Sequence, residues 1–109
     1  LELQKSVIDL NILVPEVVSG LEHSVKDRDV QWDLRVLPIF RGDLSMMKQV
    51  YVNLLSNAIK YTRPRKRTVI EVGEKSFDDQ EFILYVKDNG VGFDSAYKEK
   101  LFGVFQRLH

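Results

Sequence analysis

The side chains best suited to chemistry lie in two short runs, and the first is NLLSNAIKYT at residues 53–62. Asn53 and Asn57 are four residues apart in this run, and Lys60 follows three residues later. An asparagine carboxamide is a neutral oxygen ligand for a hard cation such as Mg²⁺, and a lysine ammonium can meet a phosphate as a point charge. Alternatively, both asparagines are ordinary surface or capping amides, because Asn-x-x-x-Asn alone is a weak motif.

The second run is DNGVGF at residues 88–93, where a carboxylate precedes a glycine turn. Asp88 follows the apolar and β-branched segment 81–87, which predicts a largely buried strand. The carboxylate accepts hydrogen bonds, so it could read an exocyclic amino group such as that of adenine. Gly90 and Gly92 would allow positive φ and a close approach of the backbone to a ligand. The alternative is a plain turn after a strand.

A long amphipathic helix is expected to position the first run. Apolar residues between 44 and 62 recur at intervals of three and four, which places them on one stripe of a helix. The three polar residues of the run fall on the opposite side. Asp43 is placed to cap the first amide groups, and Pro64 prevents the helix from continuing. The members of the apolar stripe are Leu44, Met47, Tyr51, Leu54, Leu55, Ala58 and Ile59.

The remaining segments predict the fold class. We expect an α/β two-layer sandwich, with a mixed sheet of about five strands and two helices on one face. A helix from Asn11 or Pro15 to about Lys26 would be the second helix. Strands or extended segments are predicted at residues 6–10, 31–37 before Pro38, 39–41, 68–77 and 82–87, the last two as a hairpin.

The composition argues against several classes of partner. At 109 residues, with 44% apolar and 29% charged residues, the chain has the size of one domain. Sixteen basic and sixteen acidic residues cancel, so no bulk field favours nucleic acid or a membrane. The sequence contains no cysteine, and no apolar run reaches the roughly 20 residues that span a bilayer, so we expect a cytoplasmic protein.

In their order along the chain, the two runs resemble the ATP-binding catalytic domain of sensor histidine kinases. That domain belongs to a superfamily with gyrase, heat-shock chaperone and mismatch-repair ATPases. NLLSNAIKYT is similar to its N box, and VKDNGVGFD is similar to its G1 box. LFGVFQRLH, at residues 101–109, is similar to the F box of phytochrome-like sensor kinases. The resemblance extends from about Ser6 to His109 and implies the Bergerat-type ATPase fold.

The resemblance implies ATP and Mg²⁺ as cofactors and assigns roles to residues of the N box. Asn57 would be the Mg²⁺ ligand, with Asn53 and Lys60 near the phosphates. Tyr61 would lie beside the base or the ribose. These roles are carried over from the family and do not follow from the spacing of the residues.

The resemblance also assigns roles to residues of the G1 and F boxes. Asp88 would accept a hydrogen bond from the adenine amino group, and Gly90 and Gly92 would form the turn beside it. Phe102 and Phe105 would anchor the start of the flexible lid that closes over ATP. The base end and the metal end of an ATP site would thus come from separate boxes.

The implied function is that of the ATP-binding catalytic domain of a two-component sensor histidine kinase. It would present Mg·ATP for phosphoryl transfer to a histidine on a separate dimerisation domain, with the receiver domain of a response regulator as downstream partner. No catalytic residue is expected in this chain, because the family's phosphoacceptor box is absent. His23 has its acidic neighbour on the wrong side and no proline after it, so we interpret it as a helix-surface residue.

The chain departs from the family in lacking a second glycine motif, which would hold phosphates at a helix N-terminus. Residues 1–109 are therefore expected to form a single, C-terminally truncated ATP-binding domain. A gyrase-like or mismatch-repair ATPase would need a glutamate in the long helix, and positions 44–57 contain none. A non-catalytic interaction module on the same fold stays open. So does a swapped homo-oligomer in which partner chains cover sheet edges and apolar helix faces.

A basic cluster, RPRKR at residues 63–67, follows the long helix. We predict a solvated loop rather than a nucleic-acid site, because the cluster has no interleaved aromatic residues and the net charge is zero. The weaker alternative is that one of its arginines reaches the phosphates or contacts the dimerisation domain.

Because the lid and the second glycine motif are missing, the 109-residue chain alone is predicted to bind ATP poorly and not to phosphorylate itself. Isothermal titration with Mg·ADP measures the affinity. Submicromolar binding would contradict the prediction.

Overall fold

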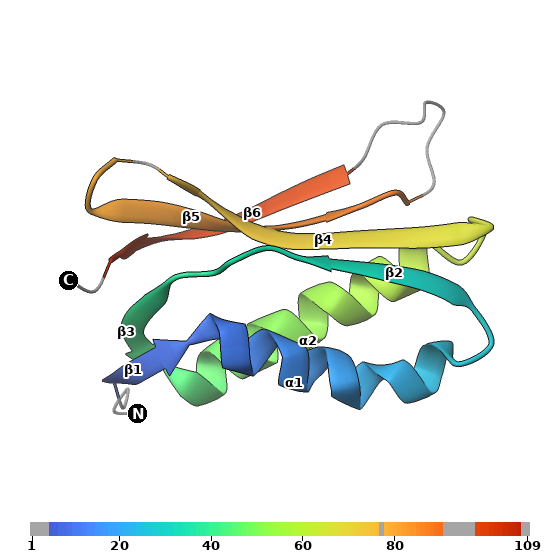
Figure 1. The fold of residues 1–109 in the computed structure, drawn as a ribbon, viewed down its shortest axis with the longest axis horizontal. Helices are drawn as coiled ribbons and strands as arrows, with labels where there is room; N and C mark the ends of the chain where they lie inside the picture. Colours follow the sequence, from blue (N-terminus) through green and yellow to red (C-terminus); the bar gives the residue numbers. More distant parts are fainter. Residues whose placement is uncertain (1–4, 77, 91–97, 108–109) are drawn as a thin grey trace.

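The computed structural model describes residues 5–76, 78–90 and 98–107, which fold into two layers (Figure 1). Two helices lie side by side against one face of a twisted sheet. Within the described ranges, neither helix is long and apolar enough to cross a membrane. The elements in chain order are β1 (Lys5–Asp9), α1 (Leu10–Leu21), the 3₁₀ turn η1 (Glu22–Val25), β2 (Asp29–Leu34), β3 (Ile39–Asp43), α2 (Leu44–Tyr61), β4 (Arg67–Ser76), β5 (Glu81–Asp88) and β6 (Lys98–Gln106).

The larger sheet has the strand order β2-β4-β5-β6, in which β2 is parallel to β4 and the other neighbours are antiparallel. In the described part of the chain, β1 and β3 pair separately as a two-stranded antiparallel ribbon. The predicted two-layer α/β sandwich, with a mixed sheet and two helices on one face, is therefore confirmed. Its strands are divided between the larger sheet and the ribbon.

The first helix begins one residue before the predicted Asn11, because Asp9 caps it. The Asp9 carboxylate accepts a hydrogen bond from the Asn11 backbone N–H at 2.9 Å. Pro15, the other predicted start, lies inside α1. The α-helix then tightens into η1, which ends just before the predicted end at Lys26.

Strand β2 ends at Leu34, short of the predicted end at Leu37. Beyond Leu34, the side chain of Asn11 bonds to the backbone of Leu37 in place of a neighbouring strand. Its Oδ1 accepts from the Leu37 N–H at 2.8 Å, and its Nδ2 donates to the Leu37 carbonyl at 2.7 Å. The predicted hairpin is present as β4 and β5, and the predicted extended segment at 39–41 is part of β3.

The hydrophobic core lies between the larger sheet and the helices. Helix α2 buries most of its predicted stripe, although Leu44 is 49% exposed and Leu54 is only partly buried. Phe40 of β3 packs edge-on against Phe82 of β5, with ring centroids 5.6 Å apart. The largest fully buried side chains are Tyr51, Phe40, Phe82, Ile8, Leu10, Leu55, Ile70 and Leu84.

On the face of the sheet away from the helices, Tyr85 lies over Gly73 and donates a hydrogen bond to Glu71 at 2.5 Å. A Cβ atom at position 73 would lie 2.5 Å from the Tyr85 hydroxyl, so only glycine leaves room for the ring. This hydrogen bond is the main reason that the pKa of Glu71 lies below its usual value. Burial, followed by the bond to Glu71, raises the pKa of Tyr85 to about 12.

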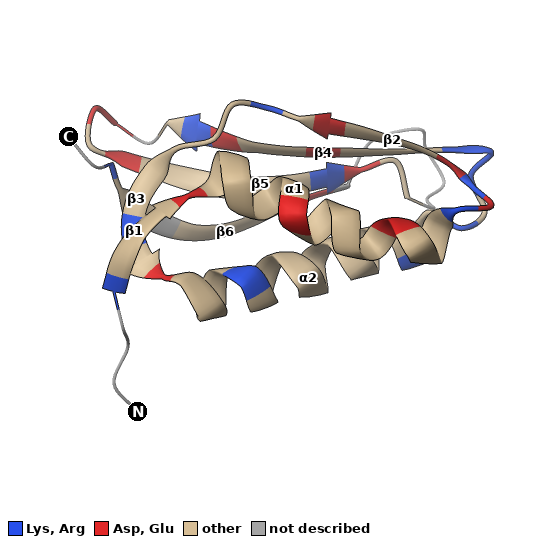
Figure 2. Cartoon of the chain, turned by 60° about the horizontal axis from the view of Figure 1, so that its bottom comes forward, with Lys and Arg blue, Asp and Glu red and all other residues tan. Residues whose placement is uncertain are grey.

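Charged residues are distributed over both layers, and basic residues gather where α2 meets β4 (Figure 2). This end of the molecule carries the RPRKR cluster at residues 63–67, together with Arg28 from the loop before β2. The same end holds the C-terminus of α2 and the end of β5.

Tyr51 supplies a test of the core. Its side chain is fully buried and its ring packs edge-on against Phe102, with centroids 5.4 Å apart. No described residue makes a hydrogen bond with its hydroxyl, and burial raises its pKa above the usual value. A buried hydroxyl without a partner costs about 1–3 kcal/mol. Tyr51→Phe is therefore expected to leave the free energy of unfolding in urea unchanged or to raise it.

Tyr51→Ala is the matched control for loss of the ring, and it should lower the free energy of unfolding by about 3–5 kcal/mol. A clear loss of stability in Tyr51→Phe would instead show that the hydroxyl has a partner in the folded protein.

Candidate nucleotide site

Helix α2 is fixed at both ends, which sets the position of its polar residues. At its start, the Asp43 carboxylate accepts from the Met46 N–H at 2.9 Å, so the predicted cap is confirmed. At its end, the Thr62 N–H bonds to the Ala58 carbonyl at 3.2 Å. The Thr62 hydroxyl donates to the same carbonyl at 2.7 Å. The last turn of α2 is thus held in helical geometry.

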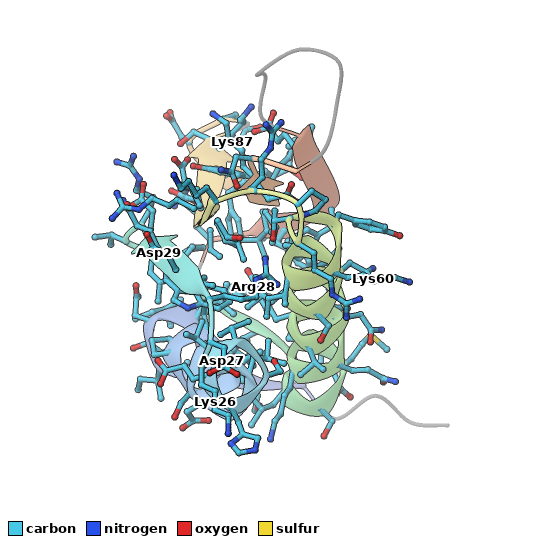
Figure 3. The ribbon with its side chains drawn as sticks, turned by 90° about the vertical axis from the view of Figure 1, so that its right-hand side faces the viewer. Lys26, Asp27, Arg28, Asp29, Lys60 and Lys87 are labelled. Carbon is cyan, nitrogen blue, oxygen red and sulfur yellow. The ribbon has the colours of Figure 1, made fainter. Side chains whose placement is uncertain are left out.

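Arg28 caps the end of α2 from the loop before β2, and Figure 3 shows its side chain pointing toward the helix. Its guanidinium donates to the Ile59 carbonyl at 2.8 Å, to the Thr62 hydroxyl at 3.1 Å and to the Thr68 hydroxyl at 2.8 Å. A cation is favourable at a helix C-terminus, where carbonyl groups lack helical partners. The sequence pattern missed Arg28, because its partners lie 31 to 40 residues away.

The polar residues of α2 lie on the side away from the core, as predicted, except that Asn57 is half-buried. Asn53 and Lys60 are exposed, and Figure 3 shows Lys60 projecting outward from the helix. Tyr61, the last residue of α2, is 46% exposed, and the Lys60 ammonium lies 5.9 Å from the centroid of its ring. One end of α2 therefore presents a carboxamide, an ammonium and an aromatic ring.

The turn after β5 is closed by Asp88, whose Oδ1 accepts the Gly90 N–H at 2.7 Å. A Cβ atom at position 90 would lie 2.6 Å from that oxygen, so any other residue here would have to displace the Asp88 carboxylate. Gly90 does not use the positive φ that glycine allows, since Gly103 alone has one, of 71°, among the described glycines. Gly92 lies outside the described residues.

Gly90 is also the point where the two runs meet. A Cβ atom at this position would lie 3.5 Å from the carbonyl oxygen of Tyr61 at the end of α2. The structure therefore brings Asp88 and Gly90 beside the last turn of α2, which carries Lys60 and Tyr61, with Asn57 one turn before them. Asn53 lies one turn before Asn57 in the same helix.

Asn89 ties the turn to strand β4 in a way that the sequence pattern did not indicate. Its Oδ1 accepts from the Val69 N–H and its Nδ2 donates to the Arg67 carbonyl, both at 2.8 Å. Its backbone N–H also bonds to the Val69 carbonyl at 3.2 Å. The carboxamide therefore extends the pairing of β4 with β5 by two side-chain hydrogen bonds.

The basic cluster is only partly the solvated loop that was predicted. Arg63, Lys66 and Arg67 are exposed. Arg65 is half-buried, and its guanidinium donates to the carbonyls of Asn89 and Gly90. The prediction is wrong for Arg65 because the turn after β5 offers two backbone acceptors within its reach.

Phe102 and Phe105 lie on β6, a strand that the sequence pattern did not predict. Phe102 packs edge-on against Tyr51, and Phe105 stacks on Phe82 with centroids 5.6 Å apart. Two residues three positions apart normally face opposite sides of a strand. The register shift opposite residues 83 and 84, with positive φ at Gly103, turns both rings toward the helix layer.

The fold is similar to that of histidine kinase catalytic domains. The catalytic domain of histidine kinase ThkA, in a nucleotide-free form, matches with a TM-score of 0.68 at 20% identity, over 84% of this chain and 63% of that chain. Acinetobacter baumannii histidine kinase AdeS matches with a TM-score of 0.67 at 23% identity, over 86% of this chain and 46% of that chain. These likenesses show the fold.

The family follows from the sequence. The profile described as "Histidine kinase-, DNA gyrase B-, and HSP90-like ATPase" matches residues 42–109, so the chain belongs to this family of ATP-binding domains. Sensor protein kinase WalK of Staphylococcus aureus is 31% identical, over 98% of this chain and 26% of that protein. Phytochrome-like protein Cph1 of Synechocystis is 26% identical, over 97% of this chain and 14% of that protein. The chain thus spans about a quarter or less of these relatives.

Asn89 gives a direct test of how the turn is held. Asn89→Ala would leave the Val69 N–H and the Arg67 carbonyl without their side-chain partner. We expect the free energy of unfolding in urea to fall by about 2–3 kcal/mol, since each lost hydrogen bond contributes about 1 kcal/mol and its partner stays desolvated. Asn53→Ala, at an exposed helix position, is the matched control and should change it by less than about 0.5 kcal/mol. Equal stability of the two variants would contradict the role of Asn89.

Proposed function

We propose that this chain is the nucleotide-binding catalytic domain of a sensor histidine kinase and that it binds Mg·ATP between the end of α2 and the turn after β5. The observation that supports the proposal is the position of Gly90 next to the Tyr61 carbonyl, by which the turn that carries Asp88 lies beside the end of α2. Membership of the ATPase family and the likeness to sensor kinases over nearly the whole chain support it.

Asp88 and Tyr61 form the base end of the proposed site. A carboxylate accepts several hydrogen bonds, so Asp88 can accept from the adenine amino group while it keeps its bond to the Gly90 N–H. The half-exposed ring of Tyr61 offers an apolar surface for the base or the ribose. Gly90, with Gly92 further along the chain, would let the base approach the backbone of the turn.

Asn57, Asn53 and Lys60 form the phosphate end. No three His, Cys, Asp or Glu side chains gather as a metal-binding group within the described ranges. The half-buried carboxamide of Asn57 fits Mg²⁺ that is held in addition by phosphate oxygens and water, the usual coordination of this ion. Lys60 would meet the phosphates with its outward ammonium, and Asn53 would lie near them. Mg²⁺ would neutralise phosphate charge during transfer.

The contribution of this domain to phosphoryl transfer is position and charge. Such transfer depends mainly on alignment and electrostatic stabilisation. We infer that the acceptor histidine is on a separate dimerisation domain and that a response regulator receives the phosphoryl group. ThkA itself has been solved in complex with response regulator protein TrrA, which supports this choice of partner. The rings of Phe102 and Phe105 would anchor a lid over the nucleotide from the adjacent strand β6.

The proposed setting is the cytoplasm, where ATP, Mg²⁺ and a receiver domain are available together. A swapped homo-oligomer of the chain is a further proposal. Within the described sheet, β2 and β6 are edge strands, and an unpaired edge can recruit another copy.

Both ends of the site are tested by the affinity for Mg·ATP in titration calorimetry. Asp88→Asn is expected to weaken binding about tenfold or more. It replaces one accepting carboxylate oxygen with a donating NH₂ group, and loss of the hydrogen bond from the adenine amino group is worth about 1.4 kcal/mol. Asp79→Asn, in the exposed β4–β5 turn, is the matched control and should bind like the parent chain.

Asn57→Ala separates the metal end from the base end. It is expected to weaken Mg·ATP binding while leaving the weaker binding of metal-free ATP unchanged, because only the former uses the carboxamide. If Asp88→Asn and Asp79→Asn bind equally well, the site is not between α2 and the turn after β5.

A further inference from the structure

We propose that Arg65 is a positioning residue for the nucleotide site: it locks the turn at residues 88–90 to the end of α2 and so holds the Asp88 carboxylate in place to select adenine. The inference rests on the proposed function, since it concerns how the base is chosen at that site. Nothing in the sequence pattern of the RPRKR cluster distinguishes Arg65 from its neighbours.

The guanidinium of Arg65 donates two hydrogen bonds to the carbonyl groups of two successive residues. Its Nε donates to the Asn89 carbonyl at 2.7 Å and its Nη2 donates to the Gly90 carbonyl at 2.8 Å. A third contact joins Nε to the Gly90 carbonyl at 3.3 Å. Guanidinium donors lie in a rigid plane and their hydrogen bonds are charge-assisted, so the pair fixes both distance and orientation.

The backbone of Arg65 is itself anchored at the end of α2. Its N–H donates to the Thr62 carbonyl at 2.9 Å, and Thr62 is the residue that caps the helix. One residue therefore connects the helix end to the turn after β5 through its main chain and its side chain. Asn89 joins the same turn to β4.

Gly90 passes this constraint to Asp88. The Gly90 N–H is held by the Asp88 carboxylate at 2.7 Å, and its carbonyl is held by Arg65 at 2.8 Å. Rotation of either peptide group of Gly90 would break one of these bonds. The Asn89 carbonyl, held by Arg65 Nε at 2.7 Å, shares one planar peptide group with the Gly90 N–H, so fixing it restricts the orientation of the carboxylate that would read the base, although Arg65 itself need not touch the nucleotide.

The neighbouring cations of the cluster offer a matched control. Arg67 is separated from Arg65 by one residue, carries the same charge and is exposed, with its Nε 3.1 Å from the Asp29 carboxylate. A salt bridge between exposed groups contributes little. If the cluster acted only by attracting phosphate, Arg65 and Arg67 would be equivalent.

The test compares the 109-residue chain with Arg65→Ala, Arg65→Lys and Arg67→Ala. For each, competition against a fluorescent ADP analogue gives the dissociation constants of Mg·ATP and of Mg·purine riboside triphosphate, which lacks the 6-amino group. We expect the parent chain and Arg67→Ala to prefer ATP by about tenfold or more, the discrimination of one good hydrogen bond. Both Arg65 variants should lose most of this preference through weaker ATP binding. Arg65→Lys keeps the charge but not the planar pair of donors, so it isolates geometry.

Amide hydrogen exchange of the nucleotide-free chain gives a second readout. In Arg65→Ala the Gly90 amide should exchange faster, while the amides of the first turns of α2 keep their protection. Unchanged protection at Gly90 would overturn the assignment.

The outcomes separate the two proposals. If the parent chain prefers ATP and both Arg65 variants keep that preference, the positioning role is wrong and the proposed function stands. Equal weakening of both nucleotides in the Arg65 variants also overturns it, because that result reports lost charge or stability. If the parent chain shows no preference for ATP, the proposed function fails and the role of Arg65 fails with it.

Discussion

The proposed site depends on the turn after β5 passing beside the end of α2, where Gly90 lies next to the Tyr61 carbonyl. The hairpin makes the contact possible. Strand β4 leaves the end of α2, and β5 returns antiparallel to it with Asp88 opposite Ile70. Because the Asp88 Oδ1 also lies against Gly90, a methyl group at position 90 would displace that carboxylate, although it would only touch the Tyr61 carbonyl. The spacing between the proposed base end and the proposed phosphate end is thus set by how the turn packs beside the helix end.

Polar side chains that bond to backbone groups frame this contact. Arg28 and Arg65 each donate to carbonyl groups near the end of α2 or after β5, and Asn89 satisfies two backbone groups of β4. A site that admits a charged ligand must be open to water at its rim, so apolar packing cannot hold it there. Hydrogen bonds from planar groups to fixed backbone atoms supply the rigidity instead.

The parts that the sequence predicted well are governed by short-range rules. The cap at Asp43, the apolar stripe of α2 and the hairpin each depend on residues close together in the chain. The parts that it missed depend on contacts between distant segments. Arg65 reaches acceptors 24 and 25 residues away. These acceptors are main-chain carbonyls, which every residue type has, so the sequence does not identify them. Strand β6 was missed because the bulge at Gly103 breaks the alternation by which strands are recognised.

The parallel pairing of β2 with β4 bears on the order in which the molecule assembles. The β4–β5 turn closes locally, with Asp78 accepting from the backbone of Gln80 and Glu81 at 2.7 Å, whereas the contact of Arg67 with Asp29 across β2 and β4 spans 38 residues. Contacts of high sequence separation form late, because the loop between them must first lose its entropy. The hairpin can therefore precede the pairing of β2 and the cap from Arg28. Nucleotide binding at the proposed site would then report that folding is complete, because the long-range contacts of Arg28 lie at the same helix end.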